Sequence, residues 1–288
     1  MKLGFHVSIA GGISNSVGNA QKLGCTAFQI FSRNPRGWTA KPLDPAEVDR
    51  FKESLAASRI KPDSVVVHMP YLPNLSGPQG ELYSKSVQTL AEELQRCSAL
   101  GIQYLVIHLG SHRGTGLAQG ISQLINAIDK AFESAEKNTG NRKKATVLLE
   151  NNAGQTNGVG ATFEDLATIL HKTDRPESEI GICLDTCHLF ASGYDISTVE
   201  GVEVTLEKFD KVVGVRKLKV IHLNDSKGEL NSNLDRHQHI GLGSIGPAGL
   251  SGFVNNRSTK DLTFIMETPI DEKRGDEENL KAALGLLK

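Results

Sequence analysis

The sequence predicts an α/β fold of the TIM-barrel type, a (β/α)8 barrel, as one domain over residues 1–288. Short apolar runs rich in β-branched residues recur along the chain, and each is followed by a segment with helical periodicity. The repeating unit is roughly 35 to 45 residues long, as in an α/β barrel. A doubly wound open sheet shares this alternation, but it seldom places polar residues at so many consecutive strand ends.

Eight segments have the length and composition of buried parallel strands. In chain order they are LGFHV (3–7), TAFQIF (26–31), SVVVHM (64–69), YLVIHL (104–109), TVLLEN (146–151), IGICLD (180–185), LKVIHLN (218–224) and LTFIME (262–267).

The segments between the strands include two clear amphipathic helices, residues 81–100 and 120–137, whose apolar residues are spaced by three and four. Cys97 falls on the apolar side of the first of these with Leu90 and Leu94, so we expect it to pack in the core.

Composition restricts the function classes. The net charge is −1 and the pI about 6.8, so a global basic field of the kind common in nucleic-acid binders is absent, and any grip on phosphates must be local. We find no apolar stretch of signal-peptide or membrane-span length, which favours a cytoplasmic protein without a membrane partner. The four cysteines lack zinc-ribbon spacing and are expected to be buried thiols. A monomer is expected.

The predicted strands from the third to the eighth all end on a potential metal ligand. Parallel barrel strands open on one face, so these side chains should converge around one mouth. Three carboxylates and three imidazoles in one pocket need an offsetting positive charge, which divalent cations supply. Imidazole with carboxylate suits zinc best, and manganese or iron are the possible substitutes. The six residues are His68, His108, Glu150, Asp185, His222 and Glu267.

Two further stretches extend this set. In CLDTCHLFASGYD (183–195), Asp185 ends the strand and His188 follows it, so both are assigned as ligands, while Cys183 and Cys187 are left as packing groups. In DRHQHIGLG (235–243), Asp235 and His237 follow the seventh strand and could hold another metal with His188.

Together these stretches resemble the endonuclease IV family of apurinic/apyrimidinic endonucleases. The resemblance runs from end to end and is carried also by HVSIAGG (6–12), FSRNPRGW (31–38), HMPYLPNL (68–75), HLGSH (108–112), ENNAGQ (150–155), HLNDSKG (222–228) and METP (266–269). It implies three zinc ions per chain. The first would be held by His68, His108 and Glu150, the second by Glu150, Asp185, His222 and Glu267, and the third by His188, Asp235 and His237.

The implied reaction is base-excision repair of duplex DNA. Water would attack the phosphate 5′ to an abasic nucleotide, leaving a 3′-hydroxyl and a 5′-deoxyribose phosphate, with Glu150 as the bridging carboxylate that orients the water. Two positions depart from the family pattern, Leu242 and Asn152; neither is a ligand, so we expect altered loop contacts or rate.

Substrate recognition is expected from loops at the same face. Arg33, Arg36 and Trp38 lie in the loop after the second strand, and they could contact phosphates or wedge into a gap in the base stack. Arg36 is the expected inserted residue. Tyr71 is expected to pack against the extruded sugar and phosphate, and His6 to hydrogen-bond within the mouth.

Two rival functions remain open. A sugar isomerase or epimerase on a related barrel would need only Glu150, Asp185, His222 and Glu267, with one metal. A metal-stabilised DNA-binding module would need closed four-ligand sites, whereas these residues leave coordination positions open.

Overall fold

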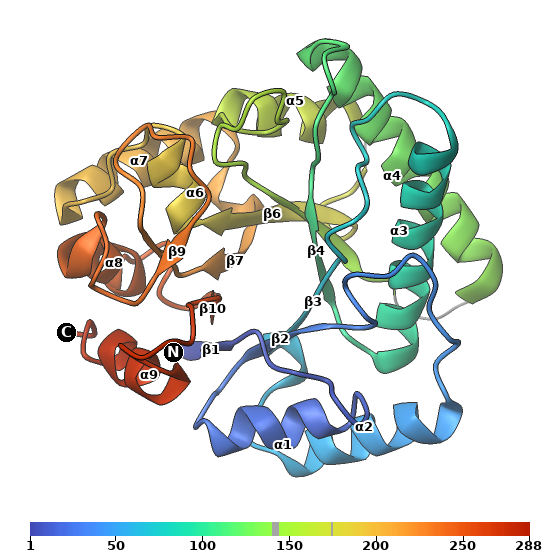
Figure 1. Ribbon diagram of the computed structural model, residues 1–288, viewed down its shortest axis with the longest axis horizontal. Coiled ribbons are helices and arrows are strands. Elements are labelled where there is room, and N and C mark those ends of the chain that lie inside the picture. The colour runs from blue at the N-terminus through green and yellow to red at the C-terminus, as the bar shows by residue number, and fades with distance from the viewer. Residues whose placement is uncertain (140–143, 174) are drawn as a thin grey trace.

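The computed structural model of the chain describes residues 1–139, 144–173 and 175–288, and it confirms the predicted barrel. Eight parallel strands form one sheet in the order β1-β10-β7-β6-β5-β4-β3-β2, with helices arranged around them (Figure 1). The barrel strands are β1 (Lys2–Phe5), β2 (Phe28–Phe31), β3 (Val65–His68), β4 (Tyr104–His108), β5 (Thr146–Glu150), β6 (Ile180–Asp185), β7 (Leu218–His222) and β10 (Thr263–Met266).

The barrel closes between β1 and β2. His6 and Gln29 form a parallel bridge, and the backbone N–H of Val7 donates to the carbonyl of Gln29 at 2.8 Å. A Cβ atom on Gly4 would lie 1.7 Å from the carbonyl oxygen of Ala27. The close approach of these two strands therefore requires glycine at position 4.

Helices follow the strands as predicted. The segment expected at 81–100 is α3 with the same bounds, and the one expected at 120–137 lies within α4. The helical elements are α1 (Asn15–Lys22), α2 (Pro45–Ala57), η1 (Pro62–Ser64), α3 (Glu81–Leu100), α4 (Leu117–Thr139), α5 (Phe163–Thr173), α6 (Thr186–Ala191), α7 (Val199–Val212), η2 (Val215–Lys217), α8 (Gly246–Asn255) and α9 (Asp276–Leu284).

Alternate residues of each strand enter two separate apolar layers, since successive side chains of a strand point to opposite faces. In β3, Val65 and Val67 join the large core between strands and helices, whereas Val66 faces the barrel interior. The interior layer consists of Ala27, Val66, Val106, Leu148, Cys183, Val220 and Ile265. It closes the barrel below the mouth.

The chain after β7 forms a small antiparallel pair, β8 (Asp225–Ser226) with β9 (His237–Gln238). The buried carboxylate of Asp225 accepts backbone N–H groups from Gly243, Ile245 and Gly246 at 3.0 to 3.2 Å. These bonds tie the chain before β9 to the chain after it, and so they help to position His237 in β9. Among the described residues, no helix has the length and apolar character needed to span a membrane.

Candidate metal centre

A ring of polar side chains lies directly above the interior apolar layer. Each barrel strand contributes one of them, at its last residue or the residue that follows, except that Gln29 is the second residue of β2. In every barrel strand except β1, this residue comes two positions after a member of the apolar layer, as Glu150 follows Leu148. The ring is made of His6, Gln29, His68, His108, Glu150, Asp185, His222 and Glu267.

Glu150 has contacts with ring members from several strands and is almost fully buried. Its Oε2 is 3.2 Å from Nε2 of His68 and 3.1 Å from Nε2 of His108. Its Oε1 is 3.0 Å from Nδ1 of His222 and 3.6 Å from Nδ1 of His188. Each oxygen of this one carboxylate thus faces a different group of ligands, which is the arrangement expected of a bridging ligand.

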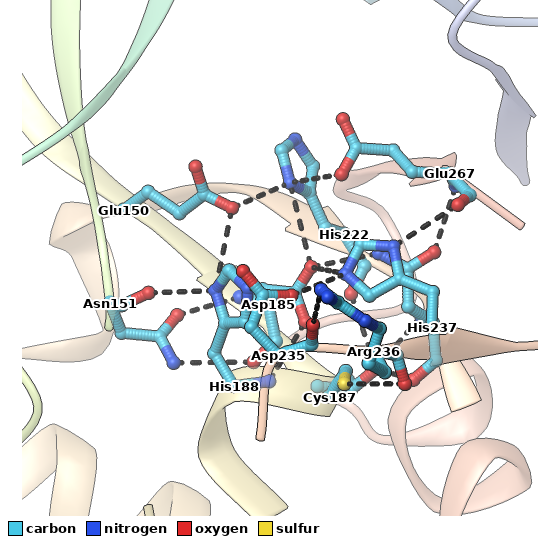
Figure 2. A network of polar contacts seen from close by, with 12 residues as sticks. Glu150, Asn151, Asp185, Cys187, His188, His222, Asp235, Arg236, His237 and Glu267 are labelled. Carbon is cyan, nitrogen blue, oxygen red and sulfur yellow. Dashed lines mark hydrogen bonds and ion pairs between the residues drawn. The ribbon is translucent and has the colours of Figure 1, made fainter. Parts of the chain in front are cut away.

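The structure brings the first two predicted ligand sets together. Ligand atoms of His68, His108 and Glu150 lie within 4.8 Å of one another, and so do those of the set made by Glu150, Asp185, His222 and Glu267. In the second set, Nδ1 of His222 is 3.8 Å from Oδ2 of Asp185 and 3.5 Å from Oε2 of Glu267 (Figure 2).

The third predicted set also converges. Oδ1 of Asp235 is 3.2 Å from Nε2 of His188 and 3.6 Å from Nε2 of His237. Asp185 comes close as well, with Oδ2 3.6 Å from Nε2 of His237, so it lies between the second and third sets (Figure 2). Asp185 can offer this oxygen because its other oxygen caps α6, accepting from the N–H of His188 at 3.0 Å.

The donor atoms fit divalent cations. The Nδ1 atoms of His68, His188 and His237 face the backbone carbonyls of Met69, Asn151 and Glu267 at 2.7, 2.9 and 3.1 Å. A carbonyl can only accept, so each Nδ1 carries a proton, and in the neutral, metal-binding form of each ring the lone pair is on Nε2. These lone pairs face carboxylate oxygens, which are also acceptors. Nε2 of His237 is buried without a hydrogen-bond partner among the described residues. Cations between the facing acceptors would satisfy them.

The electrostatics of the protein side chains alone agree with this need for positive charge. Burial by itself would raise the pKa of Glu150, but the neighbouring rings of His108 and His222 lower it well below its usual value. Burial would lower the pKa of His188, but Asp185 and Asp235 outweigh it and raise that pKa to about 10. The Glu150 carboxylate therefore remains ionised and attracts positive charge, which protons or metal ions can supply.

Both cysteines of the CLDTCH stretch are buried. Cys183 belongs to the interior apolar layer, as the packing interpretation requires. Cys187 lies within reach of Asp235 and His237, and its Sγ donates to the carbonyl of Arg236 at 3.6 Å. Burial raises the pKa of each thiol to about 12. Neither sulfur is a ready thiolate ligand at neutral pH.

Two asparagines outside the predicted ligand sets, Asn151 and Asn224, support the ligands. Asn151 accepts the N–H of Asp185 at 2.7 Å and donates to its carbonyl at 3.2 Å. Asn224 donates to Oδ2 of Asp185 at 2.8 Å and accepts the N–H of Glu267 at 2.8 Å. Asn151 directly follows Glu150, and Asn224 comes two residues after His222. This proximity to ligands in the sequence was the feature that could have indicated their supporting role.

The predicted DNA-contact residues have different placements. Arg33 is buried, with Nε 2.5 Å from Oε1 of the fully buried Glu93 and a second ion pair to Glu92 at 2.8 Å. This placement does not favour the expected phosphate contact of Arg33. Arg36 is exposed and Trp38 is half-buried.

Tyr71 is 59% exposed beside the mouth, where its ring packs edge-on against Phe31 at a centroid distance of 5.0 Å. Its backbone N–H donates to the carbonyl of Pro35 at 3.3 Å, which joins its loop to the loop that carries Arg36. The mouth beneath is a cavity of about 420 Å³ lined by His6, Tyr71 and the predicted ligands other than Asp185 and His222, which are fully buried. A second hollow of about 290 Å³ adjoins it and shares Tyr71, His108 and Glu150.

The two departures from the family pattern lie in loops. The side-chain oxygen of Asn152 accepts the N–H of Gly154 at 2.8 Å, which closes a local turn. Leu242 is 48% exposed, and its N–H donates to the carbonyl of His239 at 3.0 Å. Both therefore make hydrogen bonds within their own loops.

Comparison with known proteins places the chain among close relatives. Residues 17–288 match a family model described as xylose isomerase-like TIM barrel. The chain is 51% identical over 286 residues to a protein named probable endonuclease 4 from Cenarchaeum symbiosum, with 99% of both chains covered. A protein of the same name from Methanoculleus marisnigri is 50% identical over 278 residues, with 96% of both chains covered. The crystal structure of endonuclease IV from Thermus thermophilus superimposes with a TM-score of 0.86 at 39% identity, covering 99% of this chain and 98% of that one.

Proposed function

Because this chain belongs to the endonuclease IV family, we propose that it is a metal-dependent DNA-repair endonuclease acting on abasic sites in duplex DNA. The bond cleaved would be the phosphodiester 5′ to the abasic nucleotide, leaving a 3′-hydroxyl and a 5′-deoxyribose phosphate. The observation that carries the proposal is the convergence of nine imidazole and carboxylate side chains on one mouth, with Glu150 facing two groups of them.

We propose that the mouth holds three zinc ions, which manganese or iron could replace. The supporting observations are the two compact ligand sets that share Glu150 and the third set around His237, whose buried Nε2 needs a partner. Bound metals of this kind activate water as a nucleophile, neutralise the phosphate and stabilise the leaving oxygen.

The protein side chains would position the reactants. Glu150 has one oxygen toward each of two ligand groups, so it can set their separation and orient the attacking water between them. The backbone carbonyls of Met69, Asn151 and Glu267 fix the histidine rings so that their Nε2 lone pairs point into the mouth. This orientation exists before substrate arrives, which lowers the reorganisation needed during the reaction.

Recognition of the damaged site is assigned to the two joined loops. Tyr71 lines the metal-centre cavity, and its loop is joined to the loop that carries Arg36 and Trp38. Exposed Arg36 would reach the phosphate chain or enter the base stack. Extruding an abasic nucleotide costs less than extruding a paired base, since there is no pairing to break. Selectivity would thus arise without reading of sequence.

The sugar isomerase or epimerase alternative accounts for less of the site. It uses the set Glu150, Asp185, His222 and Glu267 but gives no reason for five further ligand-type residues to point into the same mouth. Metal content separates the two functions, since about three metal ions per chain are expected for the endonuclease and one for the isomerase.

The decisive experiment is incision of an end-labelled duplex that carries one tetrahydrofuran abasic analogue, which cannot undergo β-elimination. We expect cleavage on the 5′ side of the analogue with a 3′-hydroxyl end, and none in the same duplex without the analogue. Absence of cleavage by protein that contains its full metal complement would contradict the proposal and favour the isomerase.

We further propose that the enzyme acts as a cytoplasmic monomer.

A further inference from the structure

Gln29 is a buried polar residue that the ligand sets do not include. It lies in β2, has no solvent exposure, and takes the inward position two residues after Ala27, where most other barrel strands carry a predicted metal ligand. Its amide has three contacts. Nε2 is 2.7 Å from Oε1 of Glu267 and 3.0 Å from Nδ1 of His6, and Oε1 is 3.0 Å from Nε2 of His222.

The contacts determine which way the amide faces. An ionised carboxylate can only accept hydrogen bonds, so the amide nitrogen must face Glu267 and the amide oxygen must face His222. Because that oxygen only accepts, Nε2 of His222 has to carry the ring proton. In the neutral, metal-binding form of His222 the lone pair is then on Nδ1, the atom that points to Glu150 and Glu267 at 3.0 and 3.5 Å.

The same amide also selects the free oxygen of Glu267. Its donation to Oε1 holds the carboxylate so that Oε2 turns toward Nδ1 of His222. The second amide hydrogen goes to His6, which fixes the amide plane. One side chain thus orients two ligands that come from different strands, β7 and β10.

From this geometry we propose that Gln29 is a positioning residue for the metal site formed by Glu150, Asp185, His222 and Glu267. It holds His222 in the tautomer with a free Nδ1 and turns one oxygen of Glu267 into the site. The inference rests on the proposed metal centre. Loss of such a supporting hydrogen-bond partner typically weakens metal binding by about 10- to 100-fold.

The test is Gln29→Met, which keeps the length of the side chain and removes all three hydrogen bonds. Zinc affinity is measured by competition with a chromophoric chelator, and zinc content is measured on protein dialysed against the same chelator. We expect one of the three sites to weaken by about 10- to 100-fold while the other two keep wild-type affinity. If a folded Gln29→Met protein kept wild-type zinc affinity at all three sites, the inference would be overturned.

A matched control is Gln123→Met, the same change at a buried glutamine on α4, outside the barrel. It should leave all zinc affinities unchanged. If Gln29→Met does not fold, Gln29→Glu serves instead, because it retains an acceptor for His222 but places a carboxylate oxygen against Glu267. That variant should also bind zinc more weakly at one site, and wild-type affinity there would count against Gln29.

A spectroscopic measurement tests the tautomer directly. In zinc-loaded wild-type protein labelled with ¹⁵N-histidine, long-range proton–nitrogen correlations should show His222 protonated at Nε2. In Gln29→Met that signal should lose its fixed hydrogen-bonded shift. If wild-type protein itself fails to bind zinc, the proposed metal centre fails. Wild-type zinc binding that Gln29→Met leaves unchanged removes only the role of Gln29.

Discussion

Oε1 of Glu150 lies 3.0 Å from Nδ1 of His222, two strands away in the barrel, while its other oxygen faces His68 and His108. The carboxylate is therefore shared between two groups of ligands. Its removal should affect both groups at once, and this sharing makes Glu150 the most informative position in the mouth.

Glu150→Gln should abolish most incision of abasic DNA, by at least about 100-fold, since changes beside a metal ligand already cost about 10- to 100-fold. The neutral amide cannot serve as a charged bridge, so bound zinc should fall as well. Affinity for an abasic duplex should persist, because the loops that would contact DNA are untouched. Single-turnover incision and fluorescence anisotropy measure the two properties.

The same substitution at Glu164, an exposed residue of α5, is the control and should leave incision unchanged. If Glu150→Gln lowered DNA affinity as strongly as turnover, the result would support the DNA-binding module instead of the enzyme.

Arg36→Ala should weaken DNA binding in a salt-dependent way. If the exposed guanidinium contacts one phosphate, the slope of log affinity against log salt should become shallower by about one unit. Binding is measured in the Glu150→Gln background, which keeps the DNA intact.

Arg59→Ala is the comparison for this measurement. Arg59 is exposed in the connection between α2 and β3, at the opposite end of the barrel, so its loss should not alter the slope. An unchanged slope for Arg36→Ala would remove Arg36 from the DNA interface.

Arg33→Met should destabilise the fold. Loss of an exposed residue that only contacted phosphate would not be expected to do so. The change leaves the fully buried Glu93 without its closest partner, and uncompensated buried charges of this kind cost about 3 to 5 kcal/mol. Arg33→Met combined with Glu93→Gln should be less destabilised than Arg33→Met alone, because no buried charge is left unpaired. Chemical denaturation measures both.

The stability lost in Arg33→Met should depend on pH in a definite direction. Burial raises the pKa of Glu93 above its ordinary value even though Arg33 and Arg96 oppose the shift. A raised carboxyl pKa favours the folded state at low pH and loses that benefit as pH rises through the folded pKa. The loss of stability in Arg33→Met should therefore be larger at pH 7 than near pH 5. A loss independent of pH would mean that Glu93 ionisation is not its cause.

The cysteines should be inert in the folded protein. Burial raises the pKa of Cys25 to about 11 and of Cys183 and Cys187 to about 12, so at pH 8 only about one in ten thousand Cys187 side chains is a thiolate. A chromogenic disulfide reagent at pH 8 should find no reactive thiol until denaturant is added, when four should react.

Cys187→Ser should also keep the wild-type zinc content, because the thiol is expected to pack and not to ligate. Loss of one zinc ion in this variant would make Cys187 a ligand alongside Asp235 and His237, which lie within its reach.

Much of the fold and of the site could be predicted from the local periodicity of apolar and polar residues. Each predicted strand overlaps an observed one, since apolar β-branched runs followed by helical periodicity identify buried parallel strands without knowledge of their partners. The same period of two that buries Leu148 places Glu150 on the inward face. Ligand-type residues at the ends of the third to eighth runs therefore predicted that these side chains converge.

Gln29 shows where that pattern was available but not sufficient. It stands at the inward position of its strand like His68, yet a glutamine in an apolar run does not indicate which ligands it contacts. His222, which donates to its amide oxygen, is 193 residues away in the chain.

Sequence by itself determined the barrel, the residue types that line its mouth and the family to which they point, because these follow from local periodicity and from residue chemistry. Only the tertiary structure decided how those residues work together. The pairing of Arg33 with Glu93, the position of Asp185 between two ligand sets, and the tautomer of His222 all depend on contacts between distant segments. Such contacts are made by packing and hydrogen-bond geometry in three dimensions, and local sequence periodicity does not encode them.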